Sequence, residues 1–366
     1  MTLSILLVLF FSFILLNQNI QFSLAIDDRD QYMLFSETYS RSLNNEYKVD
    51  LPLTTNFQSE VENKVYSYEE NYVEKPDKSK KDKDKSDDED KYKDSYGKLN
   101  FVAVGDWDCN SNAKKTVKNI KKLSPEVVIG LGDYSYGSSA KCWFKLVEDI
   151  SDKLKITLGN HDTDSSKKTK EYREFFGLEK QYFSFNFENI HFLSLSTEVP
   201  YDDDSEQYDF VISDLKKYSK NPFIDWIIVF FHRQAYGSGS TPENEDDFAE
   251  TYHPIFEKYG VNLALQAHQH IYERIFPLAF DEDEEYEPII TDESYNTYDA
   301  MEGVMFITVG TGGATATGLS STNEYTAERF VKNGVLNMEI VNNGKTLKGT
   351  FYGNDKKIYD EFTINK

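Results

Sequence analysis

Short apolar runs alternate with stretches of helical spacing from about residue 99 to the end of the chain. Apolar runs of four or five residues, bounded by glycine and polar residues, are typical of buried strands. Five such runs are Phe101–Val104, Val127–Leu131, Ile156–Leu158, Ile227–Phe231 and Leu263–Ala267. Helical spacing in the intervals predicts helices at Ala113–Leu123, Trp143–Ile150 and Gln207–Tyr218. A hairpin is predicted across Glu188-Asn189, between Tyr182–Phe187 and Ile190–Ser196.

The C-terminal part of the chain has a different pattern. Apolar and polar residues alternate from Val335 to Ile364, and the alternation breaks at Asn343-Gly344 and Gly353-Asn354. These dipeptides are typical of tight turns, so the pattern predicts antiparallel strands there. No repeat of fixed period is visible. The runs together predict one α/β domain with a mixed sheet or sheets, covering residues 99–366.

The first residues resemble a targeting signal. The apolar run Leu3–Leu16 has 14 residues, whereas a membrane span needs about 20. Small residues, Ser23 and Ala25, precede a cleavage site before Ile26. We therefore expect a signal peptide at residues 1–25 and a secreted or extracytoplasmic protein. Because no Lys or Arg precedes the apolar run, an uncleaved anchor at the cell surface is the alternative.

Residues 26–98 show no sustained apolar period of either kind. Between Lys75 and Lys98, nine Lys are mixed with eight Asp or Glu. Such a nearly neutral polyampholyte cannot bury a core, so the sequence predicts a disordered polar segment before the folded domain.

Acidic residues outnumber basic ones by 63 to 40, which gives a net charge of −23. A nucleic-acid-binding protein carries a basic face, so we expect no nucleic-acid partner. Two cysteines are too few for a disulfide scaffold or a thiolate zinc cage. The chain has six histidines, so their positions are informative. The oligomeric state is not indicated by the sequence.

Each of the five apolar runs leads into residues that bind metals. In chain order the motifs are Gly105-Asp106, Gly132-Asp133-Tyr134-Ser135-Tyr136, Gly159-Asn160-His161-Asp162, His232 and His268-Gln269-His270. In open α/β sheets, functional groups gather beyond the carboxyl ends of the strands. Taken alone, each motif has an ordinary structural explanation as a turn or a core histidine. Taken together, they predict one site with two metal ions, bridged by a carboxylate such as Asp133.

The ordered set of motifs resembles the purple acid phosphatases (tartrate-resistant type), which belong to the calcineurin-like metallophosphoesterase superfamily. The resemblance covers roughly residues 100–313, including the stretch FEKYGVNLALQAHQHIYER. It implies two mixed sheets packed face to face with helices outside. It also implies an Fe(III) ion and a divalent Fe, Zn or Mn ion.

The resemblance implies a ligand set for each ion. The Fe(III) ligands would be Asp106, Asp133, Tyr136 and His270, and the divalent ligands would be Asp133, Asn160, His232 and His268. The residue types agree, because two carboxylates and a phenolate suit a hard trivalent ion, whereas an amide and imidazoles suit a softer divalent one. Tyr136 is the discriminating residue, because many dinuclear phosphoesterases need no tyrosinate.

The activity implied by the resemblance is acid phosphatase, the hydrolysis of small phosphate monoesters by metal-activated hydroxide. By resemblance, His161 lies near the substrate and protonates the leaving oxygen or orients the phosphate; it would otherwise only hydrogen-bond a ligand. Two alternatives remain. One is a phosphodiesterase or nucleotidase on the same scaffold, and the other is a non-catalytic metal-binding surface protein.

The sequence departs from the family pattern at two places. Asp108 stands where the family usually has glycine; we expect it to cap the next helix, with ligation of the first metal as the alternative. Residues 237–241 lack the further histidine that family members often carry. The sequence therefore does not indicate which residue would protonate the leaving group. Cys109 and Cys142 follow the first two ligand loops; a disulfide between them and two separate buried thiols are equal alternatives.

Overall fold

A computed structural model describes residues 25–26, 33–34, 99–238, 244–281, 288–316, 318–319 and 322–366. The chain divides into two units, Met1–Lys83 and Asp84–Lys366. In the first unit, β1 (Ala25–Ile26) pairs antiparallel with β2 (Met33–Leu34). The expected signal peptide and polar segment otherwise lie outside the described residues. Among the described helices, none is long and apolar enough to cross a membrane.

The second unit contains two seven-stranded mixed sheets. The order of the first sheet is β13-β18-β17-β16-β3-β4-β5. Its strands are β3 (Leu99–Val104), β4 (Val127–Leu131), β5 (Leu154–Thr157), β13 (Thr297–Asp299), β16 (Gly334–Val341), β17 (Thr346–Gly353) and β18 (Ile358–Asn365). Strands β3, β4 and β5 run parallel, whereas β16 joins β3 antiparallel.

The order of the second sheet is β15-β10-β14-β9-β8-β7-β6. Its strands are β6 (Phe183–Phe187), β7 (Ile190–Ser194), β8 (Trp226–Phe230), β9 (Leu263–Gln266), β10 (Tyr272–Ile275), β14 (Met305–Val309) and β15 (Thr326–Phe330). Strands β7, β8, β9 and β14 run parallel in the middle of this sheet. A small separate pair consists of β11 (Leu278–Ala279) and β12 (Ile289–Ile290).

The two sheets pack face to face through apolar side chains. Phe101 of β3 and Phe192 of β7 make an edge-to-face contact, with ring centroids 5.1 Å apart. Tyr272 of β10 packs against Phe351 of β17 at 4.7 Å. These contacts belong to one continuous core that includes buried residues of both sheets. The predicted arrangement of two facing mixed sheets is confirmed.

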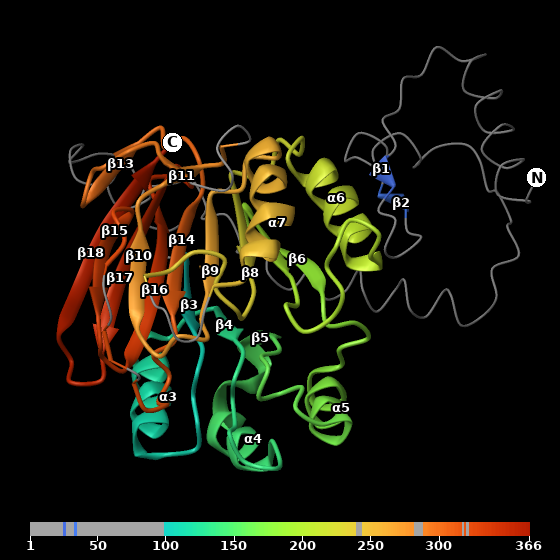
Figure 1. Ribbon diagram of the computed structural model, residues 1–366, viewed down its shortest axis with the longest axis vertical. Coiled ribbons are helices and arrows are strands. Elements are labelled where there is room, and N and C mark those ends of the chain that lie inside the picture. The colour runs from blue at the N-terminus through green and yellow to red at the C-terminus, as the bar shows by residue number, and fades with distance from the viewer. Residues whose placement is uncertain are drawn as a thin grey trace, which may run out of the picture. The chain divides into compact units, whose positions relative to one another are not determined.

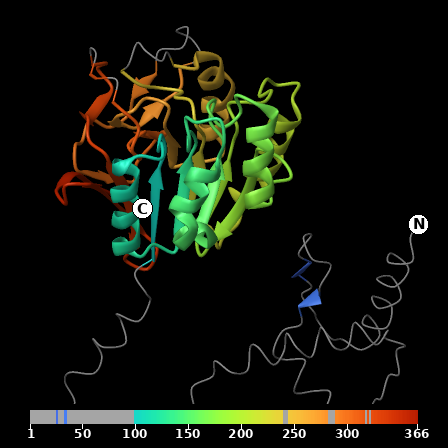
Figure 2. The same cartoon turned by 90° about the horizontal axis from the view of Figure 1, so that it is seen from below.

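Helices cover the outer faces of the sheets, as Figures 1 and 2 show. They are α3 (Ser111–Leu123), α4 (Lys141–Val147), the 3-10 helix η2 (Glu148–Lys153), α5 (Ser166–Phe176), α6 (Glu206–Tyr218) and α7 (Asp246–Lys258). Buried residues of α3 and α4 join the core of the first sheet, whereas those of α6 and α7 pack on the second. The predicted strands, hairpin and three helices are found with small shifts at their ends. The sequence analysis did not identify α5.

Candidate metal centre

The carboxyl ends of the central parallel strands converge from both sheets. Strands β3, β4 and β5 lead into Asp106, Asp133 and Asn160, while β8 and β9 lead into His232 and His268. The sheets are joined here directly, because Nδ1 of His232 lies 2.8 Å from the carbonyl oxygen of Leu131 at the end of β4. Convergence of strand ends therefore brings the predicted ligands into one place.

Three of these residues have left-handed backbone conformations. The φ angles are 54° at Asp106, 53° at Asp133 and 73° at His268. A non-glycine residue in this region costs about 1–3 kcal/mol, and such residues persist where the surrounding structure fixes them. The sharp turns direct these side chains away from the strands, which is a common feature of functional sites.

The first group of candidate ligands comprises Asp106, Tyr136 and His270. The phenol oxygen of Tyr136 lies 3.1 Å from Oδ1 of Asp106 and 2.8 Å from Nε2 of His270. Nε2 of His270 lies 3.3 Å from the same carboxylate oxygen. A carboxylate, a phenol and an imidazole therefore present their donor atoms to a single point, and this set suits a hard cation such as Fe(III).

The second group surrounds Nε2 of His232. This atom lies 3.1 Å from Oδ1 of Asn160, 3.2 Å from Nδ1 of His268 and 3.4 Å from Oδ2 of Asp133. The donor atoms of Asp133, His232 and His268 all lie within 4.8 Å of one another. Imidazole, amide and carboxylate donors in this arrangement suit a divalent ion such as Zn or Fe.

The two groups adjoin each other. The backbone N–H of His268, in the second group, donates to Oδ2 of Asp106, in the first, at 2.9 Å. Asp133 contacts the second group directly, and its charge also helps to raise the pKa of Tyr136 in the first. The structure therefore brings together all seven residues predicted as metal ligands. Their coordination of ions, and bridging by Asp133, stay predictions.

The electrostatics of the site favour a cation. Burial lowers the pKa of His232, but the charge and hydrogen bond of Asp133 outweigh it and raise that pKa to about 10. Burial also lowers the pKa of His270, but the hydrogen bond and the charge of Asp106 outweigh this effect and raise that pKa to about 9. Burial and then the charge of Asp106 raise the pKa of Tyr136 far above its usual value. A bound metal ion would take the place of these protons and favour the phenolate.

Backbone carbonyls hold two of the imidazoles. His232 faces the carbonyl oxygen of Leu131 through Nδ1, and His270 faces that of Thr315 at 2.6 Å. Each of these contacts orients the ring so that Nε2 points into the site, which is the usual support for metal-binding histidines. The residues after β14 also hold the first ligand loop, since Gly313 and Ala314 donate to the carbonyl oxygen of Asp106.

Two glycines leave room for the ligand carboxylates. A Cβ atom on Gly159 would lie 2.3 Å from Oδ1 of Asp133. A Cβ on Gly310 would lie 1.9 Å from the carbonyl oxygen of Gln269 and 2.7 Å from Oδ2 of Asp106. Any side chain at either position would displace a ligand. The close packing and the donor chemistry of both groups fit a pair of metal ions.

His161 and Asp162 support the second group from one loop. The backbone N–H of His161 donates to Oδ1 of Asp133 at 2.9 Å, and its ring lies 4.5 Å from that of Tyr136. The buried carboxylate of Asp162 accepts from the backbone N–H groups of Asp133, Tyr134 and Gly159 at 2.7–3.1 Å. The sequence analysis named Asp162 only as the last residue of the Gly-Asn-His-Asp motif and gave it no role of its own.

Asp108 does not cap the next helix, so that expectation was wrong. The cap of α3 is Asn110, whose side chain accepts from the backbone N–H groups of Asn112 and Ala113. Asp108 instead accepts from the backbone of Cys109 and from the amide of Asn110, at 2.6 and 3.0 Å. Through its bond to the Asn110 amide, Asp108 therefore orients the capping residue rather than capping α3 itself.

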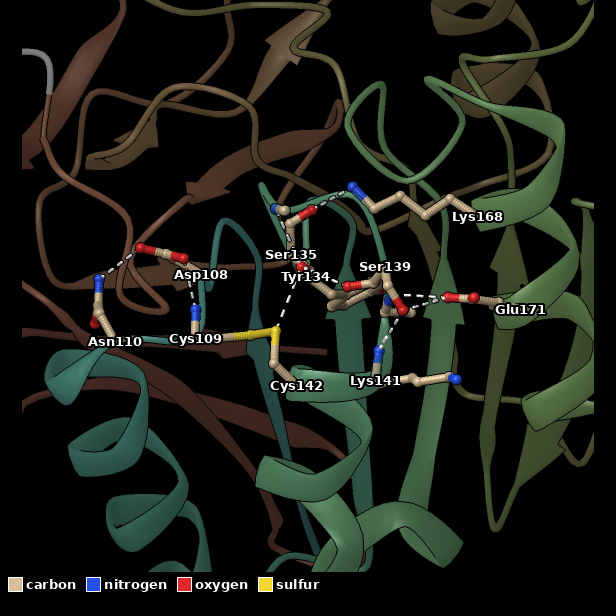
Figure 3. The surroundings of a disulfide bond; sticks show 12 residues. Asp108, Cys109, Asn110, Tyr134, Ser135, Ser139, Lys141, Cys142, Lys168 and Glu171 are labelled. Atoms are coloured by element: carbon tan, nitrogen blue, oxygen red, sulfur yellow. Dashed lines mark hydrogen bonds between the residues drawn. A yellow bond between two sulfur atoms is a disulfide. The ribbon is translucent and has the colours of Figure 1, made fainter.

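Cys109 and Cys142 form a disulfide, which decides between the two alternatives (Figure 3). Their Cα atoms lie 6.0 Å apart, within the usual range for a disulfide. The bond connects the segment after the Asp106 loop to the first turn of α4, which follows the Tyr136 loop. It therefore links two of the ligand loops.

The two remaining histidines, His191 and His253, are buried and structural. His191 lies between Asn186 and Asp214, at 2.7 and 2.6 Å. His253 lies inside α7, between the hydroxyl of Tyr236 at 2.9 Å and the carbonyl oxygen of Leu278 at 3.2 Å. In the stretch that lacks a further histidine, Ser238 instead binds the buried carboxylate of Glu273.

Several known proteins are similar in sequence to this chain. Residues 99–272 match the family described as calcineurin-like phosphoesterase. This match covers just under half of the chain. Among similar proteins of Arabidopsis thaliana are the probable inactive purple acid phosphatase 1, 27% identical over 197 residues, and purple acid phosphatase 18, 32% identical over 94 residues. These matches cover 51% and 25% of this chain but only 30% and 21% of the relatives.

Solved structures show the same fold. A purple acid phosphatase from yellow lupin (Lupinus luteus) seeds has a TM-score of 0.62 at 19% identity, over 74% of this chain and 54% of the lupin chain. GAP50 of Plasmodium, described as the anchor in the inner membrane complex, has a TM-score of 0.56 at 17% identity. That match covers 73% of this chain and 89% of the Plasmodium chain. The chain is thus a metallophosphoesterase-fold protein with purple acid phosphatase relatives.

Proposed function

We propose that this protein is an acid phosphatase that hydrolyses small phosphate monoesters at a site for Fe(III) and divalent Fe, Zn or Mn. The observation that carries the proposal is the contact of the Tyr136 phenol with both Asp106 and His270. A site for a single divalent ion would need only the donor atoms around Nε2 of His232. A phenol beside a carboxylate adds the hard, anionic donors that Fe(III) prefers.

The residues of the site would have separate roles in metal binding and in catalysis. Asp106, Tyr136 and His270 would hold the trivalent ion, Asn160, His232 and His268 the divalent one, and Asp133 both. When bound, such a pair of ions neutralises phosphoryl oxygens and activates water. His161 would orient the phosphate or give a proton to the leaving oxygen, because its loop is fixed to Asp133 while its ring is partly exposed.

The substrate class follows from charge. The net charge of −23 would repel polyanions such as nucleic acids, so we propose a small phosphate ester as substrate. We also propose secretion by way of the N-terminal apolar segment, residues 1–25. Sequencing the N-terminus of the mature protein tests this: a start at Ile26 supports cleavage, and retention of the segment supports anchoring.

The test of the activity is the release of p-nitrophenol from phosphate esters by the full chain loaded with iron and zinc. We expect hydrolysis of p-nitrophenyl phosphate at a rate well above that of bis(p-nitrophenyl) phosphate. We also expect loss of that activity in the variant His232→Ala, with Tyr295→Phe, a change at an exposed residue, as the control. Faster hydrolysis of the diester would instead identify a phosphodiesterase.

A non-catalytic role is a second candidate, because one similar protein is named as inactive and one similar fold belongs to an anchor protein. The retention of all seven ligand positions and His161 argues for catalysis, since a binding module has no need of them. Full metal occupancy without release of p-nitrophenol from either ester would support the non-catalytic role.

A further inference from the structure

Helix α5 carries a buried lysine that points at two loops of the site. The side chain of Lys168 has no exposed surface. Its ammonium donates to the backbone carbonyl oxygens of Ser135 and His161, and Figure 3 shows it directed at Ser135. Asp164 lies 3.5 Å away, but this carboxylate is 46% exposed. The ammonium is therefore held chiefly by two carbonyl groups from two separate loops.

A buried ammonium is expensive unless its N–H groups are satisfied. Lysine has three such donors, so a single ammonium can bind acceptors from several directions at once. Lys168 therefore holds the two carbonyl groups close to a single nitrogen atom, its own Nζ. One belongs to His161 itself, and the other belongs to the residue immediately before Tyr136.

The two loops that Lys168 joins carry the side chains of Tyr136 and His161. Tyr136 contacts Asp106 and His270, while the N–H of His161 binds Asp133. The rings of Tyr136 and His161 lie 4.5 Å apart, at an angle of 48°. Their separation depends on the loops that hold them, and Lys168 connects those loops from behind.

The same helix holds the far end of the Tyr136 loop. One turn beyond Lys168, the carboxylate of Glu171 accepts from the hydroxyl of Ser139 and the backbone N–H of Ala140, both at 2.9 Å (Figure 3). A positive group thus binds a carbonyl at the start of the loop, and a negative group binds an N–H at its end. Both groups come from one face of α5.

We propose that Lys168 is a positioning residue that sets the place of the Tyr136 phenol relative to His161, and so aligns the first metal with the leaving-group side of the substrate. This inference rests on the proposed function for its catalytic consequence. The structural part of the proposal, that the ammonium of Lys168 joins two loops, does not depend on the reaction.

The experiment compares Lys168→Met with Lys170→Met in the full-length protein. Both variants lose a lysine from α5, but the side chain of Lys170 is 71% exposed and pairs with Glu174 at 3.6 Å. Hydrogen exchange is measured without metal at residues 134–142 and 160–164 and at the distant strands β16–β18. Visible absorption is then recorded with iron, and kcat and KM with p-nitrophenyl phosphate.

For Lys168→Met we expect at least tenfold faster exchange in both loops and unchanged exchange in β16–β18. We expect a shifted or weaker tyrosinate band and a kcat at least tenfold lower, with KM within threefold. Lys170→Met should match the wild type. If Lys168→Met does not fold, Lys168→Gln, whose amide can still reach one carbonyl, is measured in the same way and should show a smaller change of the same kind.

Unchanged exchange in both loops, or an equal increase throughout the domain, would overturn the positioning role. If the wild type binds iron but releases no phosphate, the proposed function fails while exchange and absorption still decide the role of Lys168. A change confined to kcat, with exchange and absorption as in the wild type, would also contradict the proposal, because the loops would then not have moved.

Discussion

The phenol oxygen of Tyr136 lies 2.8 Å from Nε2 of His270, although the two residues are 134 positions apart in the chain. One comes from the loop after β4 in the first sheet and the other from the turn between β9 and β10 in the second. Asp106 meets both, at 3.1 and 3.3 Å. This meeting point between the two sheets is the basis of the first prediction.

Substitution of Tyr136 by Phe should remove the visible band of the iron-loaded protein, because phenylalanine has no oxygen to bind Fe(III). Loss of partners that only support metal ligands typically costs 10–100-fold in affinity or activity, so loss of a ligand should lower kcat by at least about tenfold. Absorption and iron content are measured together, with Tyr295→Phe as the control. A band that survives in the variant would show that Tyr136 is not a ligand.

Substitution of Asp162 by Asn should weaken the second metal position without removing a ligand. The carboxylate accepts from three backbone N–H groups, and an amide would turn one acceptor into a donor that faces other donors. We expect about 10–100-fold weaker zinc binding by calorimetry. The control is Asp149→Asn, since Asp149 pairs with Lys121 at the surface, where its side chain is 70% exposed. Equal zinc affinity in both variants would show that this carboxylate does not support the ligands.

The pH dependence of stability should contain a contribution from His253. Burial lowers its pKa to about 4, from an ordinary value of 6.5, so between these values the unfolded state binds more protons than the folded state. The contribution is complete above pH 6.5 and is lost as the pH falls toward 4, at a cost of about 3 kcal/mol.

Urea unfolding of the wild type and His253→Gln between pH 4 and pH 7 measures this contribution. The advantage of the wild type over the variant should shrink by about 3 kcal/mol toward the acidic end, because glutamine does not titrate. Other groups should cancel in the comparison. A difference that stays constant with pH would mean that the pKa of His253 is the same in the folded and unfolded states.

The disulfide should stabilise the domain. Cys109 and Cys142 are separated by 33 residues, and closing a loop of this length removes unfolded-state entropy worth about 3–4 kcal/mol. The double variant Cys109→Ser, Cys142→Ser should lose about this much in urea unfolding. Thiol titration of the denatured, unreduced wild type should find no free thiol, and two thiols per chain would exclude the bond.

The sequence predicted the strands and ligand loops well, because buried strands are short apolar runs and the ligands follow them directly. Helix α5 was missed because its sequence, SKKTKEYREFF, is too polar to show a clear apolar face. The pairing of the cysteines could not be predicted, since it depends on a distance between loops.

The supporting residues of the site were also beyond sequence reasoning. Asp162 and Lys168 act on backbone groups that lie near them only in the folded chain. Nothing in a lysine on a polar helix indicates that it is fully buried. Asp108 was assigned to the wrong role because only the folded backbone shows that α3 begins directly after Asn110, two residues beyond Asp108, so that Asn110 is the cap.

The position of β3 between β4 and β16 also bears on how the protein is made. The side chains of Asn100 and Asn337, which lie in β3 and β16, bond at 3.0 Å across 237 positions of sequence. During synthesis, β3, the strand that precedes Asp106, is made long before its neighbour β16. We therefore expect the metal centre to form late in folding, and a chain cut short before β16 would carry all seven ligands without the strand that pairs with β3.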